Sequence, residues 1–221
     1  GSDSVVLPVT DSHGGTATAN LTVNVTANTA PTLTYNNASV NAGAATSNSP
    51  SSATDNGSIT GYAVQSPGAY TGGISVNSSG VVSISNAAPV GMHTITIRAT
   101  DNCGATTDAT FTLTVGNNAP MITAGTALTR QRGSAGSVST IATVSDSETA
   151  AGSLTVTATT VPAGLSLTGI SNTAGTITAN VAADCTATLG SNSVVLTVTD
   201  SNGGTATANL TVNVTANTAP T

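Results

Sequence analysis

Apolar and polar residues alternate along most of this chain, in pairs of segments separated by a short turn. Near the end, six apolar residues alternate with Thr and Asn on either side of such a turn: Val194, Leu196, Val198, Leu210, Val212 and Val214. A period of two is the pattern of a half-buried β-strand. The turn, residues 200–204, contains an Asn-Gly pair, which supplies the positive φ of a tight hairpin. No segment sustains helical spacing, so the sequence predicts an all-β fold.

The chain also repeats itself. Residues 1–32 return almost unchanged as residues 190–221, an offset of 189 residues, and a diverged third copy occupies 94–120. The first and last copies differ at three positions only: Asp3/Asn192, Pro8/Thr197 and His13/Asn202. The aspartates that open the three turns, Asp11, Asp101 and Asp200, lie 90 and 99 residues apart. This spacing is the size of one β-sandwich domain, so the repeats indicate a tandem array.

An Asn-x-Ala-Pro sequence follows each hairpin, at Asn28–Pro31, Asn117–Pro120 and Asn217–Pro220. Proline stiffens the chain and cannot donate to a ladder, so these are expected to be linkers. We expect the closing hairpin of an incomplete upstream domain at 1–27, complete domains at 28–116 and 117–216, and the start of a further linker at 217–221. Strands are expected at 32–40, 59–65, 73–85, 121–129, 137–145, 154–160 and 175–181, before each closing hairpin. About seven short strands per domain fit a two-sheet sandwich.

Composition narrows the function classes. Three basic residues stand against nine acidic ones, and the pI is near 4.2. Binding to nucleic acid phosphates needs clustered Lys and Arg, so a nucleic-acid partner is excluded. No apolar run approaches the ~18 residues that span a bilayer, so no membrane contact is expected in this segment. Thr-, Ser-, Asn- and Gly-rich β repeats without lysine suit an extracellular or cell-surface protein.

The closing motif VTDSxGGTATAxLTVxVxxNxAP and the preceding PAGLSLTGISNTAGTITANV at Pro162–Val181 carry a family resemblance. The chain resembles the bacterial Ig-like and cadherin-like repeats of large extracellular surface proteins and adhesins. The resemblance covers essentially the whole chain. It implies tandem Ig-like (cadherin-like) β-sandwiches arranged as a rod, with neighbouring repeats or subunits of the same protein as partners.

Calcium is the one cofactor that the residues and the resemblance suggest. Hard cations need several oxygen ligands, and in a tandem sandwich the linker and two loops of the next domain meet at one pole. Cadherin-like repeats place interdomain calcium at such positions, here Asn117, Asn118, Asp146, Glu148 and Asp200. The preceding junction offers fewer candidates: Asn28, Asp55 and Asp101. The alternative is that these residues are ordinary turn formers; the family's acidic linker is replaced here by Asn, Ala and Thr.

The two cysteines are expected at opposite poles of different domains. Cys103 lies in a hairpin loop that should face the preceding domain, and Cys185 lies in the loop before a penultimate strand. Within the chain they are expected to lie far beyond the ~7 Å Cα separation that a disulfide allows. If the 189-residue unit repeats, each cysteine would instead bridge to a neighbouring repeat. The alternative is two free thiols.

Other chemistry finds little support. Asp11, Ser12 and His13 are adjacent in a tight turn and would point apart, whereas a catalytic triad needs convergent geometry. His13 is replaced by Asn202 in the last copy, and His93 has no acidic neighbour, so both are expected to be turn or surface residues. There is no Trp for sugar stacking. Tyr35, Tyr62 and Tyr70 could line a small groove, but core or turn packing is the favoured interpretation, and Phe111 is in phase with a core face.

These patterns predict a non-enzymatic structural segment of an extracellular fibre or adhesin stalk, which spans distance and supports head-to-tail assembly. The alternatives are an adhesive module that binds a glycan or protein, and an accessory stalk of a secreted hydrolase. The hairpin in residues 1–27 has six apolar side chains, worth roughly 1.5–3 kcal/mol each on full burial. We therefore expect it to be completed by an upstream domain or by a neighbouring subunit.

Overall fold

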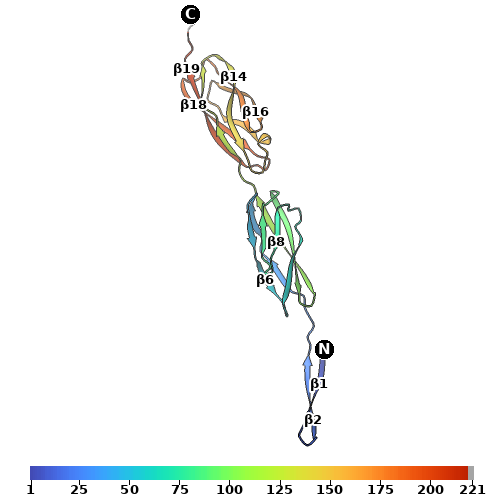
Figure 1. Ribbon diagram of the computed structural model, residues 1–221. Coiled ribbons are helices and arrows are strands. Elements are labelled where there is room, and N and C mark those ends of the chain that lie inside the picture. Colours follow the sequence, from blue (N-terminus) through green and yellow to red (C-terminus); the bar gives the residue numbers. More distant parts are fainter. Residues whose placement is uncertain (219–221) are drawn as a thin grey trace.

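The computed structural model describes residues 1–218, and these residues form nineteen β-strands and no α-helix. The single helical element is the short 3-10 turn η1 at Ala151–Ser153. In Figure 1 a two-stranded hairpin, a first sandwich and a second sandwich follow one another from the N-terminus to the C-terminus. The all-β fold predicted from the alternation is confirmed. The end of the third Asn-x-Ala-Pro sequence, at 219–220, lies outside the described residues.

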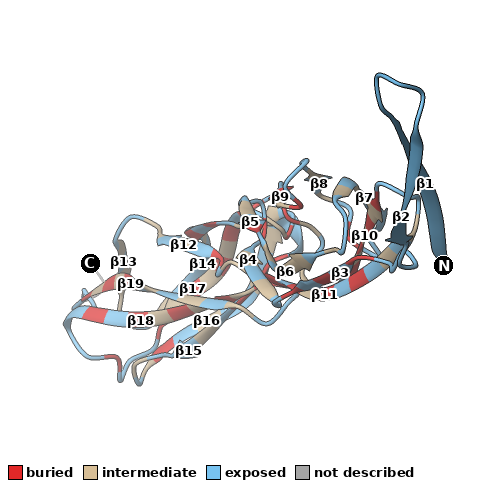
Figure 2. Ribbon diagram, turned by 90° about the horizontal axis from the view of Figure 1, so that it is seen from below, coloured by how far each residue is buried: buried red, intermediate tan, exposed pale blue. Residues whose placement is uncertain are grey.

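The hairpin consists of β1 (Ser2–Thr10) and β2 (Thr16–Asn24), paired antiparallel with Val5 opposite Leu21. Every residue of both strands is exposed, and Figure 2 shows no red or tan segment in the hairpin. Six apolar side chains of alternate positions are 41–64% exposed: Val5, Leu7, Val9, Leu21, Val23 and Val25. The hairpin therefore has an apolar face that nothing in the described residues covers.

The first sandwich runs from Thr32 to Gly116. Its strands are β3 (Thr32–Tyr35), β4 (Ala38–Asn41), β5 (Thr46–Asn48), β6 (Pro50–Thr54), β7 (Ile59–Ser66), β8 (Gly73–Val76), β9 (Val82–Ser85), β10 (Gly91–Asp101) and β11 (Thr106–Gly116). They form a sheet of order β4-β11-β10-β7, a three-stranded sheet β5-β9-β8 and the pair β3-β6. Ile95 and Ile97 of β10 and Leu113 of β11 are fully buried between these layers.

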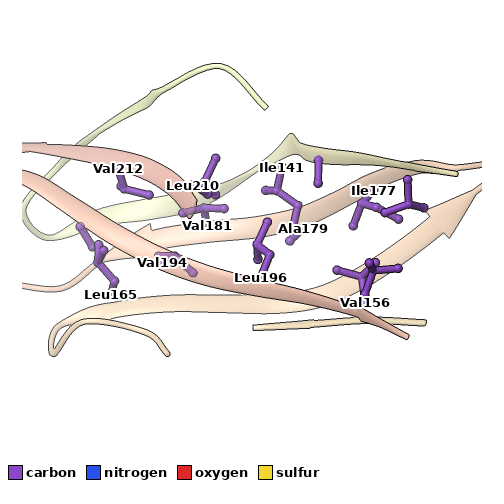
Figure 3. Packing of buried hydrophobic residues seen from close by; sticks show 14 of the residues in the cluster. Ile141, Val156, Leu165, Ile177, Ala179, Val181, Val194, Leu196, Leu210 and Val212 are labelled. Atoms are coloured by element: carbon purple, nitrogen blue, oxygen red, sulfur yellow. The ribbon is translucent and has the colours of Figure 1, made fainter. Parts of the chain in front are cut away.

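The second sandwich runs from Met121 to Thr215. Its strands are β12 (Met121–Ala124), β13 (Leu128–Gln131), β14 (Ser134–Ser145), β15 (Thr155–Thr160), β16 (Leu165–Thr173), β17 (Thr176–Ala183), β18 (Gly190–Thr199) and β19 (Thr205–Thr215). One sheet has the order β12-β14-β17-β16 and the other β13-β19-β18-β15. Figure 3 shows Ile141, Ile177 and Val181 of the first sheet packed against Leu196 and Leu210 of the second.

The first strand of each sandwich differs from its prediction. Residues 121–129 were expected as one strand, but β12 pairs antiparallel with β14 whereas β13 pairs parallel with β19 in the opposite sheet. The chain crosses between sheets near Gly125, whose N–H donates to Ile141 O (2.8 Å). A Cβ on Gly125 would lie 2.7 Å from Thr140 O, so the close crossing requires glycine. The expected strand at 32–40 is divided in the same way into β3 and β4, and the expected strand at 73–85 is instead the antiparallel pair β8 and β9.

The sequence pattern predicts no strand at three of the observed strands, which are β5, β6 and β16. In β16 the alternation of Leu165 and Leu167 is interrupted, because the pairing with β17 shifts register between Thr168 and Ser171. Gly169 has φ of 59° at this irregularity. A β-bulge of this kind breaks the period of two that identifies a strand in a sequence. The strands β5 and β6 consist mostly of small and polar residues, which give no apolar period.

The repeat provides a matched pair of core substitutions. Leu210 is fully buried, whereas its counterpart Leu21 is about half exposed. We expect Leu210→Ala to destabilise the second sandwich by about 2–5 kcal/mol, because it removes buried methyl groups and leaves a cavity. Leu21→Ala in the same local sequence should leave the melting temperature of either sandwich unchanged. Thermal unfolding of both variants by circular dichroism measures this, and equal effects of the two substitutions would contradict the packing described here.

Candidate functional site

The turns that close the three hairpin copies are built alike around one aspartate. Oδ1 of Asp200 accepts backbone N–H groups of Asn202 and Gly204, each at 2.8 Å. Oδ1 of Asp101 accepts those of residues 103 and 105, and Oδ1 of Asp11 accepts those of residues 13 and 15. One carboxylate oxygen therefore holds the turn, which is the usual role of Asp in turns, and leaves the other oxygen for a second partner.

That second oxygen binds the linker at both junctions between successive units. Asn117, which directly follows β11, donates its side-chain N–H to Asp200 Oδ2 at 2.7 Å. Asn28, in the linker after β2, donates to Asp101 Oδ2 at the same distance. Both carboxylates are buried, with 7% and 2% of the residue exposed. We call this hydrogen bond between a linker amide and a turn carboxylate the Asn–Asp clamp. It connects the end of one unit to the hairpin turn of the next.

The clamp lowers the pKa of both aspartates. The side-chain hydrogen bond from Asn117 is the main cause for Asp200, and that from Asn28 is the main cause for Asp101. The backbone N–H groups of the turn act in the same direction, whereas desolvation opposes them. Hydrogen bonds to the charged form favour ionisation, so both carboxylates stay ionised below their ordinary pKa.

A second set of contacts is present only at the later junction. The side-chain N–H of Asn118 donates to Ala42 O of the first sandwich at 3.1 Å and to Ser147 Oγ of the second at 3.3 Å. It also donates to Glu148 Oε1. Asp146 Oδ2 accepts N–H groups from the following residues of its own loop. At the first junction Asn56 donates to Ala27 O over 3.4 Å, a weaker contact.

The predicted calcium ligands lie at these two junctions, but most of their carboxylate oxygens already accept hydrogen bonds from N–H groups. Both oxygens of Asp200 and both of Asp101 accept hydrogen bonds. One oxygen at each junction, Oδ1 of Asp146 and of Asp55, is buried without a hydrogen-bond partner. Among residues 1–218 no group of three or more His, Cys, Asp or Glu could hold a metal ion. Calcium takes six to eight oxygens, and hydrogen bonds already occupy many of those at the two junctions; calcium stays a prediction.

Both cysteines are free and exposed. Cys103 lies in the turn that Asn28 contacts, on the side of the preceding unit, because its N–H donates to Asp101. Cys185 lies between β17 and β18, and its Sγ lies close to Gly133. The preceding residue, Arg132, donates its backbone N–H to Thr215 O at the end of β19. Cys185 therefore lies at the end of the second sandwich from which the chain leaves. A disulfide from either cysteine to a neighbouring repeat stays a prediction.

The candidate catalytic residues do not assemble a triad. Ser12 Oγ and His13 Nδ1 are 3.2 Å apart, but Asp11 binds the backbone N–H of His13 rather than its ring. His93 is not a surface residue as expected: it is buried, with Nε2 2.8 Å from Pro89 O and its ring edge against Tyr70. It faces inward on β10, in phase with Ile95 and Ile97. The alternation of the strand indicates this inward position, but a polar side chain is not expected in a core.

The tyrosines serve the core rather than an open groove. Tyr35 packs against Phe111 with ring centroids 5.4 Å apart and donates its hydroxyl to Gly80 O at 2.5 Å. Burial, with a smaller contribution from Tyr62, raises the pKa of Tyr35 to about 12. Tyr70 is buried and donates to Ser85 O at 3.0 Å. An open cavity of about 430 Å³ lies instead at the later junction, lined by Ala42, Gly43, residues 86–90, Ser147, Glu148 and Asn202.

The clamp should make the second sandwich sensitive to acid. Because the folded pKa of Asp200 is below its ordinary 3.8, its contribution is complete above that value and is lost as pH falls through the folded pKa. We expect Asn117→Ala to lower the melting temperature at neutral pH and to reduce the further loss on acidification. Asn28→Ala is the matched control, because it removes the clamp to Asp101 and leaves Asp200 intact. Identical melting profiles of wild type and Asn117→Ala from neutral pH to below 3.8 would contradict the assignment.

Chelation tests the fit of calcium. With the Asp200 and Asp101 oxygens already satisfied, we expect a chelator to leave the melting temperature unchanged. A rise on adding calcium would establish the ion instead, since a ligand that binds only the folded junction stabilises it. Asn117→Asp is the control: it places a second carboxylate beside Asp200, where like charges repel. This variant should be less stable than wild type and should become stabilised by calcium.

Comparison with known proteins shows what part of the chain is similar to. No curated protein matches the sequence. An endo-fucoidan hydrolase of glycoside hydrolase family 107 is 18% identical with a TM-score of 0.36, over 99% of this chain and 34% of that one. The protocadherin gamma B2 extracellular cadherin domains 1–5 are 15% identical with a TM-score of 0.40, over 97% and 45%. This chain thus spans less than half the length of either, and such scores carry no functional argument.

No helix within residues 1–218 is long and apolar enough to cross a membrane.

The model of the bacterial Ig domain matches residues 117–213, which are the second sandwich and the linker asparagines that precede it. That span also contains the closing hairpin whose near-copy forms β1 and β2. Residues 117–213 are therefore similar to a bacterial Ig domain, and the fold of the chain is all-β and Ig-like.

Proposed function

We propose that this chain is a non-enzymatic structural segment of an extracellular fibre or adhesin stalk. Its role is to span distance as a rod of tandem sandwiches and to support head-to-tail assembly, with neighbouring repeats or subunits of the same protein as partners. Bacterial Ig-like modules are typically extracellular and without catalytic activity, which agrees with this role. The domain limits at 28–116 and 117–216 belong to the same proposal.

The observation that carries the proposal is the recurrence of the Asn–Asp clamp at both junctions with the same 2.7 Å contact. Each clamp is followed by a buried proline, Pro31 or Pro120, at the entry to the next sandwich. Only residues 117–120 separate β11 from β12. A short linker fixed at its asparagine and its proline has few conformations, so successive units are restrained in their relative direction.

A second candidate function is adhesion, and the cavity at the later junction favours it. Its walls are mainly apolar, from residues 86–90, and Glu148 and Asn202 add polar groups from the next sandwich. A site of about 430 Å³ between two domains is of the size that holds a small ligand. Screening the protein against glycans and short peptides tests whether this cavity binds a ligand. The third role, an accessory stalk of a secreted hydrolase, has no contact in the described residues to support it.

The stalk function predicts where the segment lies on the producing cell. Antibodies against residues 28–216, detected by immunogold electron microscopy, should label extended surface structures at repeated positions along their length. Label confined to the tips would favour the adhesive module. Label absent from the cells, with the antigen found on a soluble hydrolase in the medium, would overturn the proposal.

A further inference from the structure

The exposed hairpin β1–β2 has a buried near-copy in the same molecule. Val194, Leu196, Val198, Leu210, Val212 and Val214 of β18–β19 are each 0–3% exposed. Their counterparts at an offset of 189 residues are the six side chains that are 41–64% exposed in β1–β2. Of the three differences between the copies, only Asp3 for Asn192 lies on this face, at its end, where Asn192 is buried in phase with Val194. The same face is therefore core in one hairpin and surface in the other.

The second sandwich shows what this face requires. The hairpin β18–β19 is flanked by β13, parallel to β19, and by β15, antiparallel to β18. The opposite sheet, β12-β14-β17-β16, supplies Ile141, Ile177 and Val181, which lie against the hairpin in Figure 3. Six strands, β12 to β17, thus cover the hairpin completely.

We propose that β1–β2 is a docking element for six strands with the sequence pattern of residues 117–189, joined in line ahead of Gly1. Translating the observed register by 189 residues places the counterpart of Leu128 opposite Val23 and that of Thr155 opposite Thr10. The hairpin then closes an Ig-like sandwich as β18–β19 does. This docking does not depend on the stalk function.

The turn of the hairpin, at Asp11, is also complementary to the docked segment. Oδ1 of Asp11 already holds its turn, and no hydrogen bond in residues 1–218 reaches its Oδ2. This is the oxygen that accepts the linker amide in Asp101 and Asp200. Gly15 corresponds to Gly204, whose missing side chain leaves room for Asn117. The docked segment begins with the counterpart of Asn117, so docking would complete a third Asn–Asp clamp at Asp11.

Two contacts allow the docked segment to be joined in line. The N–H of Gly1 donates to Val25 O at 2.7 Å, and Gly190, which the chain enters from Leu189, pairs with Val214 in the same place. A peptide bond to Gly1 keeps that hydrogen bond. A second copy of the chain fits less well, because its own six strands are already closed by β18–β19. Exchange of two nearly identical hairpins would expose as much apolar surface as it covers.

The three differences between the copies leave the six apolar residues unchanged, but one of them places Asp3 at the position of the buried Asn192. Asn192 donates to Thr188 O and Gly190 O, which Asp3 as a carboxylate cannot do. Thr197 lies opposite Thr157 in β15, and Pro8 in its place lacks a backbone N–H. Docking at β1 therefore loses at most one ladder hydrogen bond at this position. The apolar face and the turn aspartate are unchanged.

The test adds residues 117–189 ahead of Gly1 in the otherwise full chain. Amide hydrogen exchange of β1 and β2 should slow by more than about tenfold relative to the unextended chain, because these strands become part of a cooperative sandwich. Leu21→Ala, without effect in the unextended chain, should lower the melting temperature of the added sandwich by about 10 °C or more. An extension that carries Ile→Asp at the position of Ile177 is the control and should protect neither strand.

Three results would overturn the proposal. The first is an extension that folds while β1 and β2 still exchange rapidly. The second is an extension that stays unfolded beside an exposed hairpin, since the hairpin would then fail to close it. The third is protection of β1 and β2 in the unextended chain as its concentration rises, with a dimer in analytical ultracentrifugation, which would make a second copy the occupant.

Discussion

The apolar face of the closing hairpin is the constraint on which this structure depends. A hairpin with apolar residues at alternate positions cannot be stable in water unless a second sheet covers that face. In the second sandwich the strands β12 to β17 provide the cover, and Leu196 and Leu210 lie at the centre of the packed layer. The switch of the first strand from one sheet to the other at Gly125 closes the edges around the same hairpin.

The turn of that hairpin is also the place where successive units meet. Asp200 uses one oxygen to hold the turn and the other to hold Asn117, so folding of the hairpin creates the acceptor for the linker. Asp101 does the same with Asn28. The contact common to both junctions thus couples domain folding to domain connection through one carboxylate of each unit. A unit whose hairpin is not folded has no acceptor for the linker that precedes it.

The sequence allowed the fold to be predicted where the period of two is regular, as in β10, β11, β18 and β19. It failed where a strand is interrupted, because the bulge in β16 and the sheet crossing at Gly125 are tertiary features that leave no period in the chain. The junction residues follow from the tandem arrangement and the family resemblance, which imply that Asn28 and Asn117 are calcium ligands, and this stays a prediction. The structure uses their N–H groups as donors. The linkers' lack of carboxylates was the signal for this difference.

The choice of asparagine is consistent with the charge of the chain. With three basic residues against nine acidic ones, and none of the three arginines hydrogen-bonded to Asp101 or Asp200, an acidic linker would place like charges together at each junction. Such a linker needs a cation to be stable, as like carboxylates repel at short distance. A neutral amide satisfies the same buried oxygen with an N–H group and adds no like charge. Asparagine at positions 28 and 117 therefore allows each junction to close through the polypeptide's own hydrogen bonds.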